Sequence, residues 1–354
     1  MLLEASLDAC DSCCTMTDEK KQPKVHPVLD RTTSFIRAHD LDLTEEDLAE
    51  AANDGDEQRT DIVSGGNKKE LLSLGGKSGS GAIMSALVTI GLHETTDESD
   101  RWSAVSATDK ILKKRAKQLK KKKGKATADD GSIMGPWTNA AAGNDVFVWS
   151  SKCTRPGHGS EYPVVKSRGL IPASARDVVE LIRDSGRVTE YNKMSVGRED
   201  QVVLTREDSG ASVHCSVTKC PELGVPGEAK IMSSKSKPPL VRKPLEFKTL
   251  FYARQLTEED GVEMVGVAYV TVGRSVWESS EGTAEGSDGS TTRCEIMLSV
   301  NLVREIKADN EEAWCELTSI THAVSPGVPV FIGKQLGLAA AESYIKDIRA
   351  LFEK

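Results

Sequence analysis

The strongest constraint on the fold is a series of short strand-like segments in the second half of the chain. In the stretch VRKPLEFKTLFYARQL (241–256), the odd-numbered positions are apolar at Leu245, Phe247, Phe251 and Ala253, interrupted only by Thr249. A period of two is typical of a β-strand with one dry face and one wet face. Similar segments such as GVEMVGVAYVTVG, RCEIMLSVNLVREI and AWCELTSITHAV are separated by polar turns. This alternation predicts an antiparallel meander.

Two helical patterns accompany these strands. PASARDVVELIRDSG begins at Pro172, ends at Gly186 and carries apolar residues on one side, which predicts a helix. Near the C-terminus an apolar stripe with alternating spacings of three and four residues predicts a long helix; it consists of Leu338, Ala341, Ile345, Ile348 and Phe352. A long C-terminal helix packed on a curved antiparallel β-sheet is an α+β, helix-grip fold, which we expect over residues 144–354.

The region 1–140 differs in composition from the rest. Its first 100 residues carry 21 acidic and 9 basic side chains and include the Gly/Ser-rich SLGGKSGSGA. Such a composition predicts disorder. Only IMSALVTIGL (83–92) is apolar enough for a short helix.

A basic run follows at 110–125, KILKKRAKQLKKKKGK, with ten positive charges and no negative one. Three interpretations remain open: a solvated run without a specific partner, a nuclear-import or nucleic-acid patch, and a segment that binds anionic lipid. For membrane binding the expected residues are Lys113, Lys114, Lys120, Lys121, Lys122 and Lys123. The net charge of -8 argues against general affinity for nucleic acid, so we expect no specific nucleic-acid partner.

The remaining sequence signals favour a cytoplasmic protein that associates peripherally with membranes, with a nuclear location open through the basic run. No apolar run approaches the roughly 18–20 residues that span a bilayer. The start, MLLEASLDACDSCC, is acidic and lacks the pattern of a signal peptide. Lipidation of Cys13 and Cys14 stays open, and no zinc-finger spacing predicts a metal site. The scattered cysteines of the second half are expected to be buried and reduced.

Three phrases of the ordered half are similar to a known family. ASARDVVELIRDSGRVTEYNKM is similar to an internal helix pair through Asp184, Tyr191 and Asn192. SKSKPPLVRKPLEFKTLFYARQLTEEDG resembles a proline-rich turn followed by a long strand, and SPGVPVFIGKQL resembles a turn before the last helix, with Gly327 and Pro329. On these motifs residues 144–354 resemble the StAR-related lipid-transfer (START) domain family, although Ser325 stands where an aspartate is common.

The resemblance implies a lipid-binding protein that transfers one lipid between membranes. The lipid would lie in an apolar tunnel between the sheet and the C-terminal helix, which opens as a lid at an anionic membrane surface. Whether the lipid is a phospholipid, a sterol or a sphingolipid is undecided. Phe247 and Phe251 are then expected to face the tunnel, and the lid residues are expected to be Phe331, Ile332, Gln335 and Leu338.

Polar residues within the strands could contact a lipid headgroup. These are Tyr252, Tyr269, Arg274, Arg293, Glu295 and Glu316. A charge that faces a dry cavity is costly unless it is paired, so the competing interpretation is that these side chains point outward from the sheet.

We expect that the protein is not an enzyme and that it binds no cofactor. The histidines show no repeated relation to carboxylates, the ordered half lacks a GxSxG phrase, and the glycine-rich stretch lacks the order of a phosphate loop. Two alternatives stay open. One is a helix-grip enzyme that acts on an apolar small molecule, and the other is a lipid-sensing or tethering module without transfer.

Overall fold

The fold is built around one large β-sheet. The computed structural model describes residues 77–122, 145–153, 161–205, 226–239, 241–264, 266–276, 289–306, 313–326 and 328–353. The long strands in chain order are β2 (Val146–Lys152), β3 (Pro163–Ile171), β4 (Ser195–Thr205), β5 (Glu228–Ser236), β6 (Leu245–Gln255), β7 (Ala268–Ser275), β9 (Glu295–Ile306) and β10 (Trp314–Val324). Two short strands complete it, β1 (Ser103–Ala104) and β8 (Thr292–Arg293).

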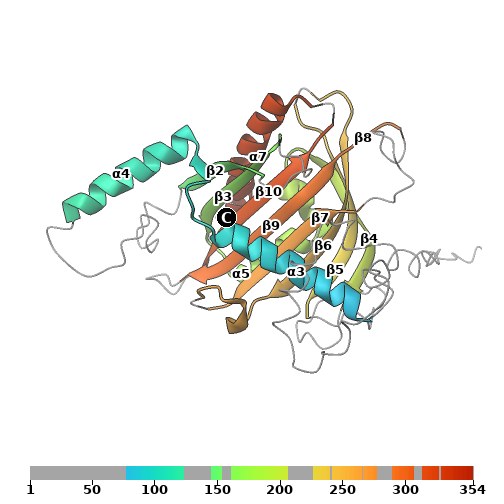
Figure 1. The fold of residues 1–354 in the computed structure, drawn as a ribbon, viewed down its shortest axis with the longest axis horizontal. Helices are drawn as coiled ribbons and strands as arrows, with labels where there is room; N and C mark the ends of the chain where they lie inside the picture. Colours follow the sequence, from blue (N-terminus) through green and yellow to red (C-terminus); the bar gives the residue numbers. More distant parts are fainter. Residues whose placement is uncertain are drawn as a thin grey trace, which may run out of the picture.

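The strands pair in the order β1-β2-β3-β10-β9-β7-β6-β5-β4, and β8 pairs with β6 off this path. Each neighbouring pair on the path is antiparallel, whereas β8 runs parallel to β6. The long C-terminal helix α7 (Val330–Phe352) lies across one face of the sheet (Figure 1). The predicted helix-grip arrangement is therefore confirmed.

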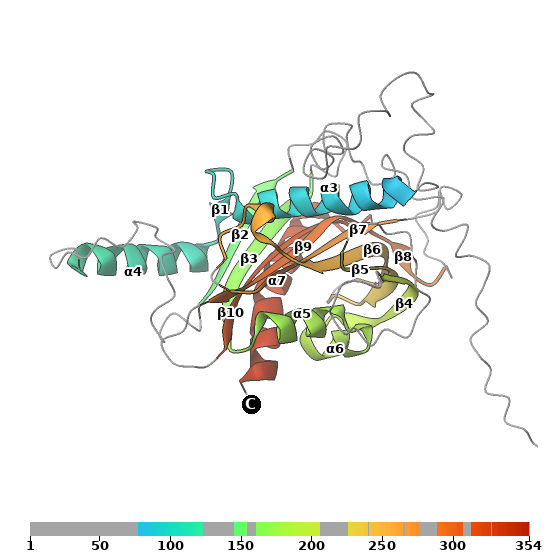
Figure 2. The ribbon, with the colours of Figure 1, turned by 90° about the horizontal axis from the view of Figure 1, so that it is seen from below.

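Helices cover both faces of the sheet (Figure 2). We call the inner face the one that carries α5 (Ala175–Arg183), α6 (Val188–Tyr191) and α7, and the outer face the one that carries α3 (Lys77–Thr96). The inner apolar cluster includes Val165, Val303, Leu317, Ile345 and Ile348. The outer cluster joins α3 to the strands and includes Ile83, Leu87, Val270, Val300 and Ile320.

The outer face differs from the expected wet face because α3 covers it. The short helix expected at 83–92 forms the centre of α3, and Leu87 is 1% exposed. Gly91 lets the helix approach closely, since a Cβ there would lie 2.9 Å from Cγ1 of Val272. The packed domain thus includes α3, which lies outside the expected range of 144–354. The disorder predicted for 1–76 and for 123–140 lies outside the described residues.

The C-terminal half of α7 is fixed to the sheet. Ile345 and Ile348 of the predicted apolar stripe are fully buried, and Nε of Arg349 donates to the carbonyl of Leu170 at 2.8 Å. Gly169 of β3 is required here because a Cβ would lie 2.6 Å from Cγ2 of Ile345. The helix is therefore anchored at one end, and its first turns extend beyond this contact.

The helix expected from Pro172 begins three residues later. Ser174 caps α5 by accepting a hydrogen bond from the backbone N–H of Asp177 at 3.1 Å. A short 3-10 turn, η3 (Ser185–Arg187), then leads into α6. A second 3-10 turn, η4 (Glu258–Asp260), follows β6. The turn η3 connects α5 to α6, and both helices lie beside α7 on the inner face (Figure 2).

Candidate functional site

A cavity of about 600 Å³ lies between the inner face and α7. This volume lies within the range of about 300–1,000 Å³ that is typical of small-molecule pockets. The larger apolar and aromatic side chains that line it are Tyr162, Val165, Ile182, Val188, Tyr191, Met194, Met232, Leu245, Phe247, Phe251, Ile296, Val328, Leu336 and Tyr344. The sheet, α6 and α7 thus build a largely apolar chamber in the middle of the domain.

The cavity exists because α7 carries small residues on the side that faces the sheet. Gly333, Gly337, Ala340 and Ala341 all line the cavity. A Cβ on Gly337 would meet Val165 at 3.6 Å, an ordinary van der Waals contact, so a leucine or phenylalanine at this level would fill the space. The sequence pattern marks the two glycines as weak points of the helix, and the structure shows that they also leave room for a ligand.

Phe247 and Phe251 lie where the strand pattern placed them. Both project from β6 into the cavity, together with Leu245 and Thr249 of the same parity. Phe251 is 6% exposed, and Nζ of Lys230 lies 5.7 Å from the centroid of its ring. The odd-numbered face of the stretch 241–256 is therefore both core and cavity wall.

The floor of the cavity is polar. In register across neighbouring strands stand Ser167 of β3, Ser319 of β10, Asn301 of β9 and Thr271 of β7. The first three line the cavity. Within the described part of the chain, Oγ of Ser167 and Oδ1 of Asn301 are buried without a hydrogen-bond partner. An unpartnered buried polar group costs about 1–3 kcal/mol, so these atoms favour a partner from the cavity.

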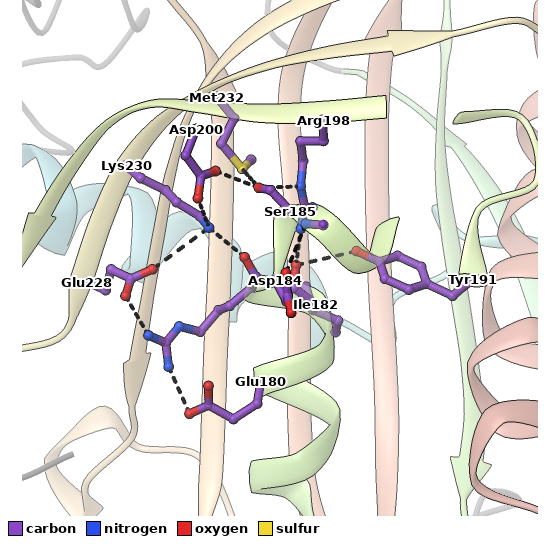
Figure 3. A network of polar contacts seen from close by, with 12 residues as sticks. Glu180, Ile182, Asp184, Ser185, Tyr191, Arg198, Asp200, Glu228, Lys230 and Met232 are labelled. Carbon is purple, nitrogen blue, oxygen red and sulfur yellow. Dashed lines mark hydrogen bonds and ion pairs between the residues drawn. The ribbon is translucent and has the colours of Figure 1, made fainter. Parts of the chain in front are cut away.

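A polar network holds one side of the chamber together (Figure 3). Lys230 of β5 is 2% exposed, and its Nζ donates to Oδ2 of Asp200 at 3.0 Å and to the carbonyl of Arg183. Arg183 in turn contacts the carboxylate of Glu228. Arg198 of β4 donates to Oγ of Ser185 at 2.9 Å and to the carbonyl of Ile182 at 2.7 Å. The network ties α5 and η3 to β4 and β5, so we assign it a structural role.

The first turns of α7 meet the sheet through a small apolar seam. We call the seam the cluster of Leu245, Cys294 and Val328 with the partly buried Val241, Phe247 and Ile332 packed on it. The hydroxyl of Tyr162 donates to the carbonyl of Ser325 at 3.3 Å beside it. Burial raises the pKa of the Cys294 thiol to about 11, which keeps it protonated and apolar at neutral pH. The seam borders the cavity and holds the first turns of α7 with few side chains, unlike the extensive inner cluster at the other end of α7.

Three residues proposed to contact a lipid point away from the cavity. Tyr252, Arg274 and Glu316 lie on the outer face. The hydroxyl of Tyr252 donates to the carbonyl of Pro226, and Arg274 donates to the carbonyl of Met297. Because side chains alternate along a strand, the parity that places Phe251 inside places these residues outside.

Glu316 is nevertheless deeply buried, because α3 and the segment that follows it cover the outer face. It is 2% exposed, and its oxygens lie 2.7 Å from Nη2 of Arg168 and 2.6 Å from Nη2 of Arg304. Burial alone raises the pKa of this carboxyl, but the two guanidinium groups outweigh burial and hold the pKa below its usual value. Glu316 therefore stabilises the outer side of the sheet as a paired charge.

The other predicted ligand residues also fall outside the cavity lining. Arg293 lies 3.8 Å from Glu295 at the junction of β8 and β9. Tyr269 is on the inner face but packs on the inner cluster near α5. On α7, Ile332 belongs to the seam, Leu338 packs on the inner cluster, and Phe331 and Gln335 are exposed. Two of the predicted ligand residues, Phe247 and Phe251, line the chamber.

The basic run lies mostly in helix α4 (Ser106–Lys122), which extends away from the sheet (Figure 1). Its first turn is attached to the domain because Oγ1 of Thr108 accepts a hydrogen bond from the backbone N–H of Val148 at 2.7 Å. Lys113 and Lys114 are exposed. Of Lys120, Lys121 and Lys122 the backbone alone is described, and Lys123 lies outside the described residues.

The sequence-based predictions missed Ser167, Ser319 and Asn301. Ser167 and Ser319 are small polar residues at inward positions of strands whose neighbours of the same parity are mainly apolar, whereas Asn301 lies between Ser299 and Val303 in this pattern. Thr249 carried the same signal, because it interrupts the apolar positions of the stretch 241–256. The sequence analysis instead predicted that charged residues in the strands would contact the ligand, although a charge is the group that an apolar cavity tolerates least.

The cysteines and metal ligands add no further site in the described ranges. Cys294 and Cys315 are buried and form no disulfide bond, as predicted, whereas Cys153 is only partly buried. The other cysteines lie outside the described residues: Cys10, Cys13, Cys14, Cys215 and Cys220. Among the residues that the structure describes, no group of three histidine, cysteine, aspartate or glutamate side chains could hold a metal ion. In the same ranges, the helices are all too short or too polar to cross a membrane.

These features define a helix-grip protein with an internal, mostly apolar cavity under its C-terminal helix. No protein-family model matches the chain, and no curated protein sequence matches it. Among solved structures it is similar to the human StarD13 lipid transfer and protein localization domain, with 14% identity, a TM-score of 0.41, and coverage of 68% of this chain and 96% of that one.

Two further structures show a similar fold. Human StAR-related lipid transfer protein 5 has 11% identity, a TM-score of 0.42, and coverage of 70% of this chain and 97% of that one. A STAR-related lipid transfer protein from Xanthomonas axonopodis has 12% identity, a TM-score of 0.41, and coverage of 72% and 100%. The likeness is that of a START-like fold, and no ligand or activity is taken from it.

Proposed function

We propose that this protein is a non-enzymatic lipid carrier, which binds one lipid molecule in the cavity under α7 and moves it between membranes. The observation that carries the proposal is a cavity of about 600 Å³ between the sheet and α7 whose walls are mainly apolar. Each CH₂ group of a lipid tail that leaves water gains about 0.8 kcal/mol, so a tail of about ten CH₂ groups gains roughly 8 kcal/mol.

We propose that part of the cavity wall moves as a lid when a lipid enters or leaves. The first turns of α7 are the proposed lid, since the seam holds them with a handful of side chains while Ile345 and Ile348 anchor the other end. Gly333 and Gly337 weaken the helix where it would unwind. Local opening is expected where few buried apolar contacts must be broken.

The same end of α7 is suited to contact a membrane. Phe331 and Val330 are 68% and 38% exposed, and Lys334 is exposed in the next turn. An exposed aromatic residue can enter the interfacial region of a bilayer, and nearby lysines favour anionic lipid. Helix α4 with Lys113 and Lys114 would add electrostatic attraction, and we propose a cytoplasmic protein that binds such membranes transiently.

The test is lipid extraction and transfer by the full chain. The protein is purified from cells, its mass is measured under native conditions, and bound molecules are extracted and identified. Donor vesicles with a fluorescent lipid and unlabelled acceptor vesicles then measure transfer. A stoichiometric lipid and protein-dependent transfer are expected. If the purified protein contains no lipid and also extracts none from vesicles, the lipid-carrier function is refuted. The alternative of a helix-grip enzyme would then be favoured.

Bound lipid without transfer would refute the transfer step alone. That result would favour a lipid-sensing or tethering module. A variant that separates binding from transfer is Phe331→Ala, because Phe331 does not line the cavity. We expect this variant to keep the bound lipid but to transfer it more slowly, because it removes the exposed aromatic ring from the proposed membrane contact.

A further inference from the structure

The cavity floor contains a polar group that packing alone does not explain. Asn301 is 6% exposed, lines the cavity, and donates from Nδ2 to Oγ1 of Thr271 at 2.9 Å. Its Oδ1 has no partner among the described residues. Of its two neighbours of the same parity on β9, Val303 belongs to the inner apolar cluster and Ser299 also lines the cavity. The buried amide oxygen of Asn301 indicates contact with something polar inside the chamber.

Two hydroxyl side chains stand next to Asn301 on the floor. Ser319 pairs directly with Asn301, and Ser167 pairs with Ser319 on its other side. Neighbouring strands lie about 4.8 Å apart, so a group seated over Ser319 lies between Asn301 and Ser167. Oγ of Ser167 is also buried and has no partner within the described ranges. The three side chains form one neutral polar spot, which we call the polar floor.

The floor carries no charge. The charged residues that line the cavity are Lys193, Arg198, Lys235 and Asp347, and none belongs to β3, β9 or β10. Nζ of Lys193 lies 2.6 Å from Oδ1 of Asp347, and Arg198 bonds Ser185 and Ile182. A phosphate or carboxylate on the floor would be buried without a counter-ion, which is strongly unfavourable.

We propose that the polar floor binds the hydroxyl group of a neutral lipid, with the apolar body of that lipid directed toward α7. A hydroxyl both donates and accepts, so it complements the Asn301 amide in either orientation and leaves its second bond for Ser319 or Ser167. An ether oxygen only accepts, and an anionic headgroup only accepts and adds charge. This inference rests on the proposed lipid-binding function and names the chemical class that the cavity selects.

The experiment compares lipids that differ in this one group. Full-length protein is incubated with phosphatidylcholine vesicles that contain equal amounts of hexadecanol, its methyl ether and hexadecanoate. The protein is recovered, and the extracted lipids are quantified by mass spectrometry. The same experiment is repeated with a sterol and its methyl ether, because the shape of the apolar body is a separate property.

We expect the alcohol to be retained about tenfold over its ether in at least one pair, as one well-placed hydrogen bond to a buried group would give. Asn301→Leu keeps a similar volume and should abolish the preference while ether uptake persists. Ser167→Ala, a smaller change, should weaken the preference. The matched control is Thr318→Val on the outer face of β10, which is 3% exposed and should leave the preference unchanged.

The wild-type result alone can overturn the proposal, so it does not depend on the folding of a variant. Equal retention of both alcohols and their ethers would overturn the hydroxyl site while leaving lipid binding intact. Preferential retention of hexadecanoate or of phosphatidylcholine would overturn it in favour of a charged headgroup. Retention of no lipid would overturn both the hydroxyl site and the proposed function.

Discussion

Replacing both Gly333 and Gly337 by alanine tests whether α7 opens for lipid exchange. Each glycine costs about 1 kcal/mol relative to alanine in a helix interior, so the double variant should stabilise this segment by about 2 kcal/mol. The new methyl groups fit, because the nearest atoms to the added Cβ lie 4.0 Å away at Gly333 and 3.6 Å away at Gly337. The change therefore strengthens the first turns of α7 without displacing the sheet.

The two expected results are a higher melting temperature and slower lipid transfer. For a domain of this size, 2 kcal/mol corresponds to a rise in Tm of about 4–8 °C. If the segment must unwind before lipid leaves, the same free energy adds to the barrier and slows transfer by roughly 30-fold. Transfer is followed by stopped-flow dequenching between donor and acceptor vesicles, and Tm by circular dichroism.

A control variant separates local opening from overall stability. Ala350→Gly changes an exposed position in the anchored end of α7 and should destabilise the helix by about 1 kcal/mol. We expect its Tm to fall while its transfer rate stays at the wild-type value. If the double alanine variant gains stability but transfers lipid at the wild-type rate, α7 does not unwind during exchange, and the proposed lid is wrong.

Three further predictions follow from burial and charge. Glu316→Gln should destabilise the protein by about 3–5 kcal/mol at pH 7, because it leaves two arginines without their buried carboxylate. The folded-state pKa of Glu316 is lowered, so its stabilisation is fully present above the unfolded value of 4.5 and is lost as the pH falls through the folded value. Urea unfolding at pH 7 and pH 3 should show that the difference in unfolding free energy between wild type and variant becomes smaller in acid. A difference that does not change with pH would contradict this. Leu87→Ala should cost about 2–5 kcal/mol if α3 belongs to the folded unit, whereas the exposed control His93→Ala should unfold at the wild-type urea concentration. Ala340→Phe should fill the chamber and abolish recovery of bound lipid in the native mass spectrum while the circular dichroism spectrum is retained; bound lipid at the wild-type level would place the ligand elsewhere.

Much of the fold was predictable because it depends on local periodicity. The alternation in β6 placed Phe247 and Phe251 on the dry face of the strand, and the stripe through Ile345 and Ile348 predicted the buried side of α7. Both patterns arise from the geometry of a single element, a period of two in a strand and about 3.6 in a helix. A sequence contains this information in consecutive residues, without knowledge of what packs against the element.

The tertiary structure decided which layer covers each face. The even-numbered side of β6 looked wet because it carries Tyr252 and Arg254, yet α3 packs on the outer face and buries Tyr252 to 1% exposure. Alternation states that neighbouring side chains point to opposite faces, but it does not state what lies beyond either face. The composition of 1–140 could not indicate this either, because the acidic and basic segments around α3 dominate the average.

The site itself was the least predictable part. Ser167, Ser319 and Asn301 are far apart in the chain and become neighbours only when β3, β10 and β9 pair. The chamber above them depends on small residues of α7 facing that same region of the sheet. The sequence by itself determined the strands, the helices and their apolar sides, because these follow from short-range backbone geometry. The cavity and its polar floor were decided by the tertiary structure, because strand order and helix placement bring distant residues into contact.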